Sequence, residues 1–548
     1  MKILRKMIAV LLFLWDSRQA MIVEYGGPIN LFMRLWKCLL SRASLGDMLS
    51  QMAYMRRADP KVYERWIRRV ENRSSDPTSG LIHLLVRVDE GQKDAFLSML
   101  SSIEKNERVG TLWVYGSISN ESIQSCSLAS DKAVIHLSVW RELLQPPIRE
   151  SDKLLVLSAP ALVEWQRLGM LERSIEEGAG VVLFDHDHWI DNKRCHPVFK
   201  PVTFDEYLLV RPEYKECALT TLGALNGLPE DLDADVLATL MLMQKVRVCP
   251  SVLVHFLAVP TMSSLKPTDV YETDLCSVSI VIPTRDRLDL LDKCVDSILA
   301  NLGSIRPEIV VVDNGSVEEK TLEWLSAATE SGKIKVVTDS GEFNWSRLCN
   351  EGIKASSGEV LIMLNNDIEI RSIGWLEALT ARALRPDVGV VGAQLRYANG
   401  SIQHAGTVLG YGGAADHVYM HSQPNIDQWR YFPPPSLDRE VSACTGACQV
   451  FRRSHIDQYG YYDESLNIVG DVEWCVRLRN QGLHNVYVGK VYLIHHESQS
   501  RKAGLPDGDY AAVKKLNKEL PGRVDPHFHP EISLQSRYPM PRLFSNGS

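Results

Sequence analysis

Three aspartates stand next to predicted strands or at the start of a predicted helix. Carboxylates at such positions can bind a metal ion, bind a substrate or accept a proton. Asp313 follows the apolar run 309–312, Asp367 follows the run 360–364, and Asp471 opens a helical pattern. Carboxylates bind hard divalent cations, accept hydrogen bonds from hydroxyl groups and remove protons from nucleophiles. Turns and helix starts also favour aspartate for structural reasons, so none of the three identifies a function by itself.

The elements that must position these side chains are expected to be parallel strands. Apolar runs predict strands at 278–282, 309–312 and 360–364, and an amphipathic pattern predicts a helix after the first of them. Open α/β sheets bind ligands beyond the carboxyl ends of their strands. The sequence therefore predicts that the polar segments after these strands meet at one edge: Pro283, Thr284, Arg285 and Asp286; Asp313 and Asn314; and Asn365, Asn366 and Asp367.

Two later segments add further candidates. The helix that Asp471 opens also carries Glu473 and Trp474, and a predicted strand at 491–494 runs into His495. A carboxylate at a helix start can act as a general base. An imidazole is an acceptable ligand for Mn²⁺, although carboxylates suit that ion better.

The chain is predicted to contain two α/β domains between terminal segments. We predict a helical N-terminal segment at 1–75, a first domain at 76–262, a second domain at 272–505 and a C-terminal tail at 506–548. The alternation of strand-like and helical patterns predicts a mostly parallel sheet covered by helices in each domain. The boundaries fall on segments rich in Ser, Asp, Thr and Pro.

The two predicted domains begin with a repeated segment. Aligned without gaps, 83–106 and 278–301 share identical residues at Val86/Val281, Asp94/Asp289, Ser102/Ser297, Ile103/Ile298 and Asn106/Asn301. Each segment has the pattern of a strand, a turn and an amphipathic helix. The order of the elements that follow is also similar, which favours an internal duplication.

The composition excludes several classes of protein. The chain has 548 residues, a formal net charge of −8, 45% hydrophobic and 23% charged residues, which excludes disordered, collagen-like and disulfide-scaffold proteins. The mild negative charge argues against nucleic-acid binding, which needs a basic surface. The eleven cysteines include no CxxC pair and favour a reducing compartment; Cys444 and Cys448 are interpreted as small core residues.

The N-terminus leaves two interpretations open. The apolar run 8–15 follows Lys2, Arg5 and Lys6, and it is too short to span a bilayer. Residues 1–20 either form an interfacial membrane anchor or pack as a basic helix on the body of the protein. The reducing compartment that the cysteines favour predicts a cytoplasmic protein, and the first interpretation of residues 1–20 adds peripheral contact with the inner face of the cytoplasmic membrane.

Eight segments, taken in order, resemble glycosyltransferase family 2 enzymes of the GT-A fold, particularly those that build bacterial surface polysaccharides. They cover about residues 275–505 and read VSIVIPTRDR, EIVVVDNGS, FNWSRLCNEG, GEVLIMLNNDIEI, IQHAGTVLG, CTGACQVFRR, GDVEWCVRLRNQG and HHESQSR. In the first half, YERWI, FDHDHWIDNKRCHPVFKP and CPSVLVHF resemble the leading domain of tandem family 2 proteins. The resemblance implies an α/β GT-A nucleotide-sugar-binding fold in two tandem copies, the first degenerate.

The resemblance also implies an activity and a set of site residues. It implies inverting transfer of a sugar, by a hexosyltransferase or rhamnosyltransferase, from a nucleotide-sugar donor to a saccharide or lipid-linked saccharide acceptor in O-antigen-like or capsule-like synthesis. Asp471 would be the general base, and Asp367 and His495 would bind Mn²⁺ or Mg²⁺. The implied donor-binding residues are Pro283, Thr284, Arg285, Asp286, Asp313, Asn314, Arg347, Asn350, Asn365 and Asn366, and the implied acceptor-binding residues are Gln403, His404, Glu473 and Trp474.

The second half departs from the family pattern at two positions. Asn365 stands at the first position of the metal motif, where aspartate is usual. Gly470 precedes Asp471 where an acidic pair is frequent, which leaves Asp471 as the candidate base and Glu473 as a nearby reserve.

The first half departs further from the pattern. By the internal repeat, Gly116 stands in place of Asp313, and Ser-Ala-Pro at 158–160 stands in place of 365–367. These losses predict a first domain that does not catalyse. Asp235 still parallels Asp471, which argues in the other direction.

Two alternatives belong to other functional classes. One is a non-catalytic nucleotide-sugar or glycan-binding subunit of a polysaccharide-assembly complex, and it stays open. The set Asp313, Asp367 and Asp471 argues against it, because a purely structural protein has no evident need for these carboxylates. A dinucleotide-dependent oxidoreductase is excluded because the first predicted strand is followed by PTRDR and not by a glycine-rich phosphate loop.

Overall fold

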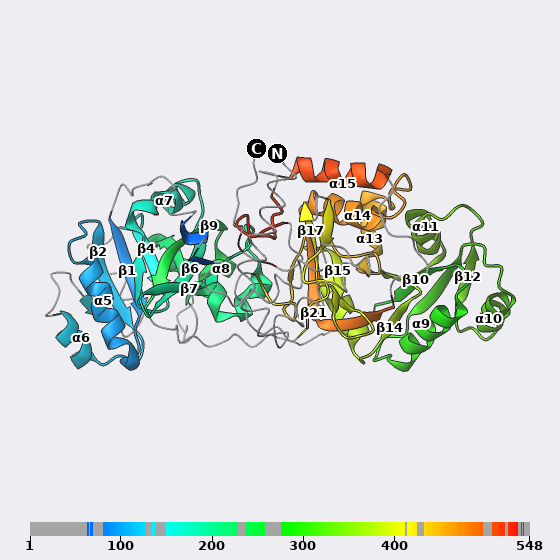
Figure 1. Cartoon of the computed structure of the whole chain (residues 1–548), viewed down its shortest axis with the longest axis horizontal. Coiled ribbons are helices and arrows are strands. Elements are labelled where there is room, and N and C mark those ends of the chain that lie inside the picture. The colour runs from blue at the N-terminus through cyan, green and yellow to red at the C-terminus, as the bar shows by residue number, and fades with distance from the viewer. Residues whose placement is uncertain are drawn as a thin grey trace, which may run out of the picture.

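The structure, a computed structural model, describes two lobes that lie side by side (Figure 1). Lobe 1 is formed between residues 81 and 257, and lobe 2 between residues 276 and 496. Each lobe is built around one large sheet. The described residues are 63–64, 66–68, 81–127, 134–137, 149–227, 236–257, 276–411, 414–424, 432–496, 507–520, 524–534, 539 and 541.

The sheet of lobe 2 has ten strands, and its main path is β12-β11-β10-β13-β20-β15-β21-β14. The pairs around β10 are parallel, whereas β20 runs antiparallel to β13 and β15. Its central strands are runs of Val, Ile and Leu because helices cover both faces of the sheet. The strands of lobe 2 are β10 (Val278–Thr284), β11 (Glu308–Asp313), β12 (Lys335–Thr338), β13 (Val360–Leu364), β14 (Ile368–Ile370), β15 (Val388–Arg396), β16 (Ile402–His404), β17 (Thr407–Leu409), β18 (Ala415–His417), β19 (Arg439–Glu440), β20 (Cys448–Arg452) and β21 (His484–His495).

Helices pack on both faces of this sheet and form two separate cores. One core contains apolar residues of α9, α10 and α12, and the other contains residues of α11, α13 and α14. In α9 the buried residues Leu291, Val295 and Ile298 form one stripe, as the amphipathic pattern predicts. The helices are α9 (Leu288–Ala300), α10 (Glu319–Glu330), α11 (Trp345–Ala355), α12 (Trp375–Ala383), α13 (Arg453–Tyr459), α14 (Gly470–Arg479) and α15 (Asp507–Glu519).

Lobe 1 has the same strand order as lobe 2. Its main path is β3-β2-β1-β4-β8-β6-β9-β5, and β7 pairs with β6 as β16 pairs with β15. Strand directions also correspond, since β4 and β8 are antiparallel and β6 and β9 are parallel. The strands are β1 (Ile82–Arg87), β2 (Val109–Tyr115), β3 (Val134–His136), β4 (Lys153–Leu157), β5 (Ala161–Val163), β6 (Val181–Ile190), β7 (Lys193–Val198), β8 (Cys217–Thr221) and β9 (Val246–Phe256).

The helices of lobe 1 also have counterparts in lobe 2. The α-helices are α5 (Lys93–Ile103), α6 (Asn120–Ser127), α7 (Gly169–Glu176) and α8 (Val236–Met243), and the 3-10 helices are η1 (Glu90–Gln92), η3 (Trp165–Arg167), η4 (Glu206–Val210), η5 (Pro212–Lys215) and η6 (Leu222–Gly227). The repeated sequence segments fall on β1 and α5 in one lobe and on β10 and α9 in the other. The repeat found in the sequence therefore coincides with two sheets of one topology.

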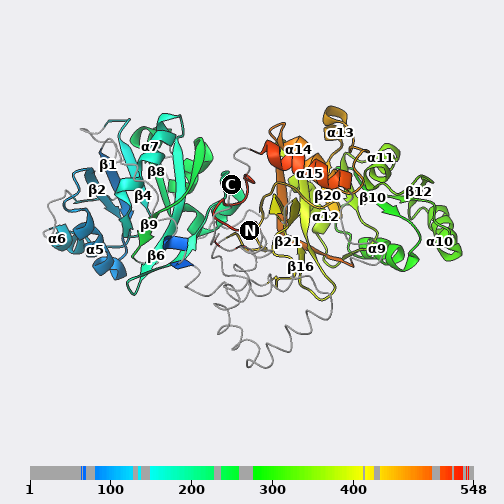
Figure 2. The ribbon, with the colours of Figure 1, turned by 45° about the horizontal axis from the view of Figure 1, so that its top comes forward.

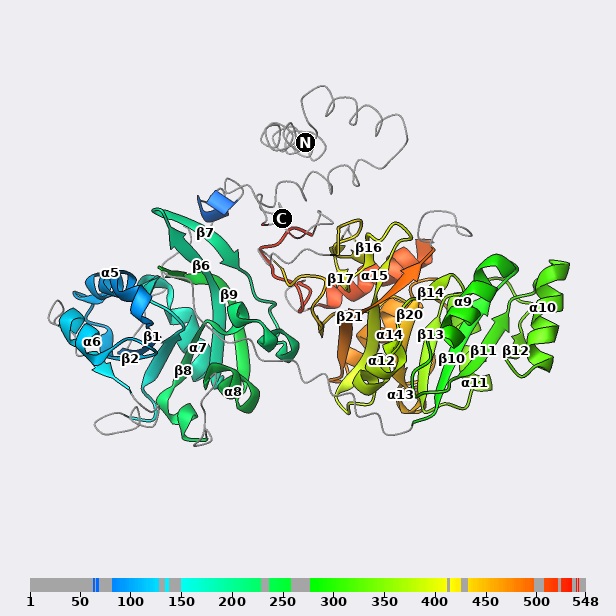
Figure 3. The same ribbon diagram turned by 90° about the horizontal axis from the view of Figure 1, so that it is seen from below.

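Residues 524–534 lie between the two lobes and contact both (Figure 3). The backbone N–H of Leu409 in lobe 2 donates to Asp525 Oδ2 at 2.7 Å. His529 Nε2 lies 2.7 Å from Asp185 Oδ2 on β6 of lobe 1. This part of the predicted C-terminal tail is thus an integral connection between the lobes.

The structure tests the other predictions in part. Cys444 and Cys448 are buried and form no disulfide, which confirms them as core residues. In the described part of the chain, no helix combines the length and the apolar character that crossing a bilayer requires. The two interpretations of residues 1–20 fall outside the described residues and stay predictions.

Candidate active site

Asp367 and His495 form the centre of the predicted metal site. Asp367 precedes β14, and His495 ends β21, which pairs with β14. Asp367 Oδ1 lies 3.0 Å from His495 Nε2, and His495 Nδ1 lies 2.8 Å from Gln403 Oε1. If Nδ1 donates its proton to Gln403, the lone pair of Nε2 faces a carboxylate. Such a contact requires a proton or a cation between the two atoms.

This pair fits a divalent cation. Neighbouring ligands of an octahedral ion at about 2.1 Å are themselves about 3 Å apart. Burial acts to raise the pKa of Asp367, but the hydrogen bond and charge of His495 outweigh it and hold that pKa below its ordinary value. The described residues contain no cluster of three or more His, Cys, Asp or Glu side chains that could hold a metal ion. The remaining ligands would therefore be substrate oxygens and water, as is usual for Mg²⁺.

Asp471 lies in the first turn of α14, close to the metal motif. Its Oδ2 accepts the backbone N–H of Gly446 at 2.7 Å, and the next residue, Ala447, accepts the N–H of Asn365 at 3.1 Å. One turn thus connects the predicted base to the predicted metal motif. Glycine is needed at 446 because a Cβ there would lie 2.5 Å from the Trp345 ring.

The ends of three strands meet beside the metal pair, as the sequence predicts. Thr284 and Asp313 stand opposite each other at the ends of β10 and β11. Asn366 Nδ2 donates to Thr284 Oγ1 at 2.9 Å, which brings in the end of β13. Asp313 Oδ1 accepts the N–H of Ser316 at 3.1 Å, and none of the described residues pairs with its Oδ2. That oxygen is therefore left for a ligand.

The loop after β10 is held in an uncommon backbone conformation. Asp286 and Arg287 have φ angles of 52° and 53°, in the left-handed region that non-glycine residues seldom adopt. The N–H of Asp286 donates to Ser316 Oγ at 2.7 Å, and Asp286 Oδ1 accepts the N–H groups of Val317 and Glu318 at 2.7 and 2.9 Å. The side chain of Asp286 therefore fixes the edge where Asp313 lies.

Two predicted site residues, Trp474 and Asn350, lie in the core of this structure. Trp474 is 0% exposed and packs against the rings of Phe451 and Tyr462, because its side of α14 faces the sheet. Asn350 is 1% exposed, and its amide exchanges hydrogen bonds with the backbone of Tyr462. Both side chains are therefore part of the protein core next to the predicted site.

Gln403 and His404, predicted to bind the acceptor, are also buried and have other roles. Gln403 orients His495 through the contact described above. His404 Nδ1 lies 2.8 Å from His417 Nδ1, and burial, followed by the charges of His417 and Arg439, holds the pKa of His404 well below its ordinary value. Neither side chain is available to an acceptor in this structure.

The remaining predicted residues surround the site, and several are already paired. Arg347 Nη2 lies 3.1 Å from Asp339 Oδ1, and Glu473 forms a two-point pair with Arg477. Asn314 is buried, and its Nδ2 donates to the backbone carbonyls at 339 and 341. Pro283 is part of β10, and Arg285 follows it on the surface.

One supporting residue was missed by the sequence analysis. Asp509 on α15 is 2% exposed and accepts the backbone N–H groups of Asn467, Ile468 and Val469 at 3.1, 2.7 and 3.3 Å. These residues form the turn that leads into α14, and α15 lies against α14 (Figure 2). The segment 507–520 thus holds the helix that carries Asp471. Nothing in its sequence pattern distinguishes Asp509 from an ordinary acidic residue at a helix start.

Lobe 1 lacks the metal pair at the corresponding place. Pro160 precedes β5 as Asp367 precedes β14, and Phe256 ends β9 in the register at which His495 ends β21. The backbone hydrogen bond beside the pair is kept in both lobes. Asp235, which the repeat aligns with Asp471, lies outside the described residues.

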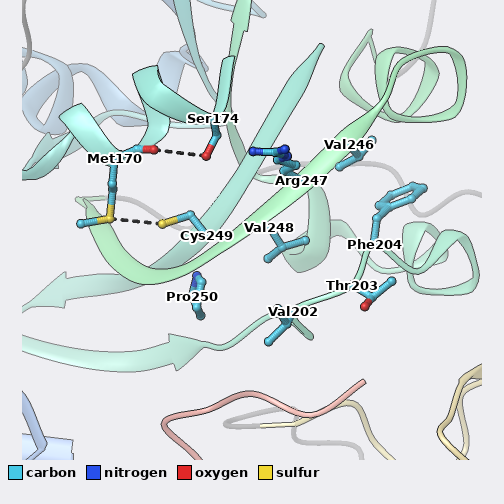
Figure 4. A pocket seen from close by; sticks show the side chains of 10 residues that line it. All are labelled: Met170, Ser174, Val202, Thr203, Phe204, Val246, Arg247, Val248, Cys249 and Pro250. Atoms are coloured by element: carbon cyan, nitrogen blue, oxygen red, sulfur yellow. Dashed lines mark hydrogen bonds between the residues drawn. The ribbon is translucent and has the colours of Figure 1, made fainter. Parts of the chain in front are cut away.

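A hollow of about 550 Å³ lies in lobe 1, away from these residues (Figure 4). Apolar side chains such as Val202, Phe204 and Val248 form much of its wall, and the sulfur atoms of Met170 and Cys249 meet at one side. Its lining includes no carboxylate and no histidine. It therefore offers no carboxylate or imidazole ligand to a metal ion.

Known proteins are similar to parts of this chain. Residues 279–460 match the model of Glycosyl transferase family 2. The chain is 42% identical over 267 residues to the uncharacterized protein y4gI of Sinorhizobium fredii, covering 47% of this chain and 29% of that protein. It is 36% identical over 260 residues to the O-antigen biosynthesis protein RfbC of Myxococcus xanthus, covering 47% of this chain and 20% of that protein. The chain thus spans less than a third of the length of these two relatives.

Solved structures with a similar chain trace include two with nucleotide sugars. The mannosyltransferase PcManGT from Pyrobaculum calidifontis, in complex with GDP-Man and Mn²⁺, has a TM-score of 0.33 and 14% identity, and the match covers 45% of this chain and 71% of that one. TarS 1–349 of S. aureus in complex with UDP-GlcNAc has a TM-score of 0.33 and 18% identity, with 45% and 68% covered. The family match, together with the sheet of lobe 2, shows that the chain carries a glycosyl transferase family 2 domain with a GT-A-like α/β fold.

Proposed function

We propose that lobe 2 is an inverting, metal-dependent glycosyltransferase that moves a sugar from a nucleotide-sugar donor to a saccharide or lipid-linked saccharide acceptor. The observation that carries the proposal is the single turn that joins Asp471 to Asn365, because it sets a carboxylate beside the Asp367 and His495 pair. A hydroxyl attack on an anomeric carbon needs a base on one side of the sugar and charge neutralisation at the leaving diphosphate on the other.

Each residue has a distinct part in the proposed reaction. Asp313 Oδ2 accepts a hydrogen bond from the nucleoside, which lies at the ends of β10 and β11 where Thr284 and Asp313 stand opposite each other. Asp286 holds the loop beside these strand ends in place. Asp367 and His495 would hold Mn²⁺ or Mg²⁺, and the ion would supply positive charge that stabilises the leaving diphosphate. Asp471 accepts the proton of the acceptor hydroxyl. At the same time the hydroxyl oxygen forms a bond to the anomeric carbon, and the bond from that carbon to the diphosphate breaks.

Lobe 1 is proposed to be a non-catalytic copy of the same fold. Pro160 and Phe256 supply no ligand to a cation at the place of Asp367 and His495. Its contacts with residues 524–534 instead make it a support for lobe 2.

Surface polysaccharide synthesis is the proposed context. The relative from Myxococcus xanthus is named an O-antigen biosynthesis protein, and we extend that context to this chain. Such acceptors are saccharides or lipid-linked saccharides, which agrees with a cytoplasmic enzyme at the inner face of the membrane.

The test is release of free nucleoside diphosphate from UDP-, dTDP- and GDP-sugars with Mn²⁺. Metal-dependent release from one donor, lost in Asp367→Ala, supports the transferase. The binding-subunit alternative predicts metal-dependent binding of a nucleotide sugar and no release with a mixture of bacterial lipid-linked and soluble saccharides as acceptors. Equal release by the native protein and Asp367→Ala would contradict the proposed metal site.

A further inference from the structure

A hollow of about 310 Å³ lies beside the metal pair on lobe 2. It is lined by Arg371, Arg396, Ala398, Gly400, Tyr492, Ile494 and His496. Tyr492, Ile494 and His496 alternate along the end of β21, so they share one side of that strand, whereas His495 lies on the other. The hollow is therefore next to the candidate metal site but separate from it.

Positive charge is in excess around this hollow. A group of charged side chains surrounds Glu369. Its carboxylate lies 2.7 Å from both Lys293 Nζ and Arg371 Nη2 and 2.8 Å from His496 Nε2. One carboxylate is thus shared by two cationic side chains and an imidazole. Arg396 adds a further positive charge that Glu369 does not neutralise.

Arg396 is held in place without a carboxylate partner among the described residues. Its Nε donates to Gln394 Oε1 at 2.6 Å, and its Cζ lies 3.9 Å from the centre of the Tyr492 ring. A guanidinium stacked on a ring keeps its in-plane N–H groups for a planar or tetrahedral oxyanion. Partial burial makes an unpaired arginine costly, so a ligand that pairs with it gains affinity.

The turn between β15 and β16 forms part of the wall of the hollow. Gly400 has a φ of +84°, and a Cβ at this position would meet no atom within 4 Å. The turn closes on itself through a bond from the N–H of Gly400 to the carbonyl of Tyr397 at 2.8 Å. The side chain that this turn adds to the wall of the hollow is therefore the small methyl group of Ala398.

We propose that this hollow binds a phosphoryl group of the acceptor, with Arg371 and Arg396 as the cationic ligands. The assignment to the acceptor rests on the proposed function, because the donor diphosphate belongs to the Asp367 and His495 side of β21. A volume of about 310 Å³ accommodates a phosphate or a diphosphate with part of a sugar. The acceptor would be a phosphorylated saccharide or a saccharide on a lipid diphosphate, since both present this group.

The first experiment measures binding of inorganic pyrophosphate to the full chain by calorimetry in EDTA, where the metal site cannot contribute. Native protein and Asp367→Asn are expected to bind it equally, and Arg396→Gln and Arg371→Gln at least tenfold more weakly. Lys320→Gln, which changes an exposed charge on α10, is the matched control and should bind as the native chain does. Equal binding by the native chain and both arginine variants overturns the site, as does no binding to the native chain.

The second experiment identifies the source of the phosphoryl group and separates it from the donor. Glucose 1-phosphate and farnesyl diphosphate are compared as ligands in EDTA. Tenfold tighter binding of the second, lost in Arg396→Gln, indicates a lipid-linked acceptor, and similar binding of both indicates a soluble one. In donor hydrolysis with Mn²⁺, Arg396→Gln should leave the KM for the nucleotide sugar unchanged; a tenfold rise would overturn the assignment to the acceptor. If no donor is hydrolysed, the proposed transferase activity is rejected. The pyrophosphate measurement still shows whether the hollow binds an anion.

Discussion

Asp367 Oδ1 and His495 Nε2 face each other at 3.0 Å across the end of the β14 and β21 pair. Gln403 Oε1, 2.8 Å from His495 Nδ1, fixes the ring so that Nε2 is the atom presented to a cation. Partners behind a metal-binding histidine set both its orientation and its basicity.

The first prediction concerns that partner. Gln403→Leu should keep the fold but weaken Mn²⁺ activation about 10- to 100-fold, because the imidazole loses the acceptor that fixes its tautomer. The concentration of Mn²⁺ at half-maximal nucleoside diphosphate release measures this effect. Gln403→Glu, which keeps an acceptor, should retain most of the activation. A Leu variant with native Mn²⁺ dependence would remove Gln403 from the site.

The second prediction separates catalysis from binding at Asp471. Asp471→Asn should lower kcat about 10²- to 10⁴-fold, because an amide cannot accept the acceptor proton. Its Oδ1 can still accept the N–H of Gly446, so the turn should persist and the Kd for the nucleotide sugar should stay within about twofold of native. Glu473→Gln is the matched control on the same helix and should keep most of the activity. A large loss of donor affinity in Asp471→Asn would show that Asp471 binds substrate instead.

The sequence was enough to predict which edge of the sheet carries the candidate site. That edge depends on apolar runs, which can be recognised within a few residues. Continuous apolar runs predict strands, parallel strands carry their polar ends to one edge, and Thr284, Asp313 and Asp367 meet there as expected. The repeat also falls on matching elements in the two lobes, since the same strand and helix pattern fixes the same packing.

The side-chain roles could not be predicted in the same way, because they depend on which face of a helix packs. Trp474 and Asn350 occur in motifs shared with the family, yet both are buried: Trp474 packs against Phe451 of β20, and Asn350 bonds to the backbone of Tyr462. Gln403 orients His495 from 92 residues away, and the bonds from Asp509 to the turn before α14 span about 40 residues. Only the tertiary fold brings such residues together.

The third prediction tests the support that α15 gives to the base. Asp509→Ala should reduce the free energy of unfolding by about 1–3 kcal/mol, because buried N–H groups before α14 lose their acceptor. Activity should fall more than donor affinity, since α14 carries Asp471. Urea denaturation and nucleoside diphosphate release measure the two effects, and Asp507→Ala, at an exposed position of the same helix, is the control. Native stability of Asp509→Ala would contradict a supporting role for α15.

The fourth prediction is a pH dependence of stability that originates in lobe 1. Burial raises the pKa of Glu216 to about 7, and Glu216 Oε2 lies 2.5 Å from His186 Nε2, whose pKa burial holds well below its ordinary value. Both groups are therefore neutral in mildly acidic solution. His186 Nδ1 lies 3.2 Å from Lys200 Nζ, which can only donate, so Nε2 carries the imidazole proton and donates to Glu216. A pKa that is higher in the folded than in the unfolded chain stabilises the fold below the unfolded pKa, and this stability is lost as pH rises through 7.

Glu216→Gln removes this titration, because the amide oxygen can accept the Nε2–H of His186 at every pH. Thermal unfolding at pH 5.5 and 8.0 should show a large loss of stability at the higher pH for the native chain and a smaller loss for Glu216→Gln. The difference is about 2 kcal/mol, because about 1.5 pH units lie between pH 5.5 and the folded pKa of about 7, at about 1.36 kcal/mol each. Glu107→Gln, at an exposed position, should behave as native. If Glu216→Gln loses as much stability between the two pH values as the native chain does, Glu216 is ionised in the folded state throughout, and the buried pair must be charged.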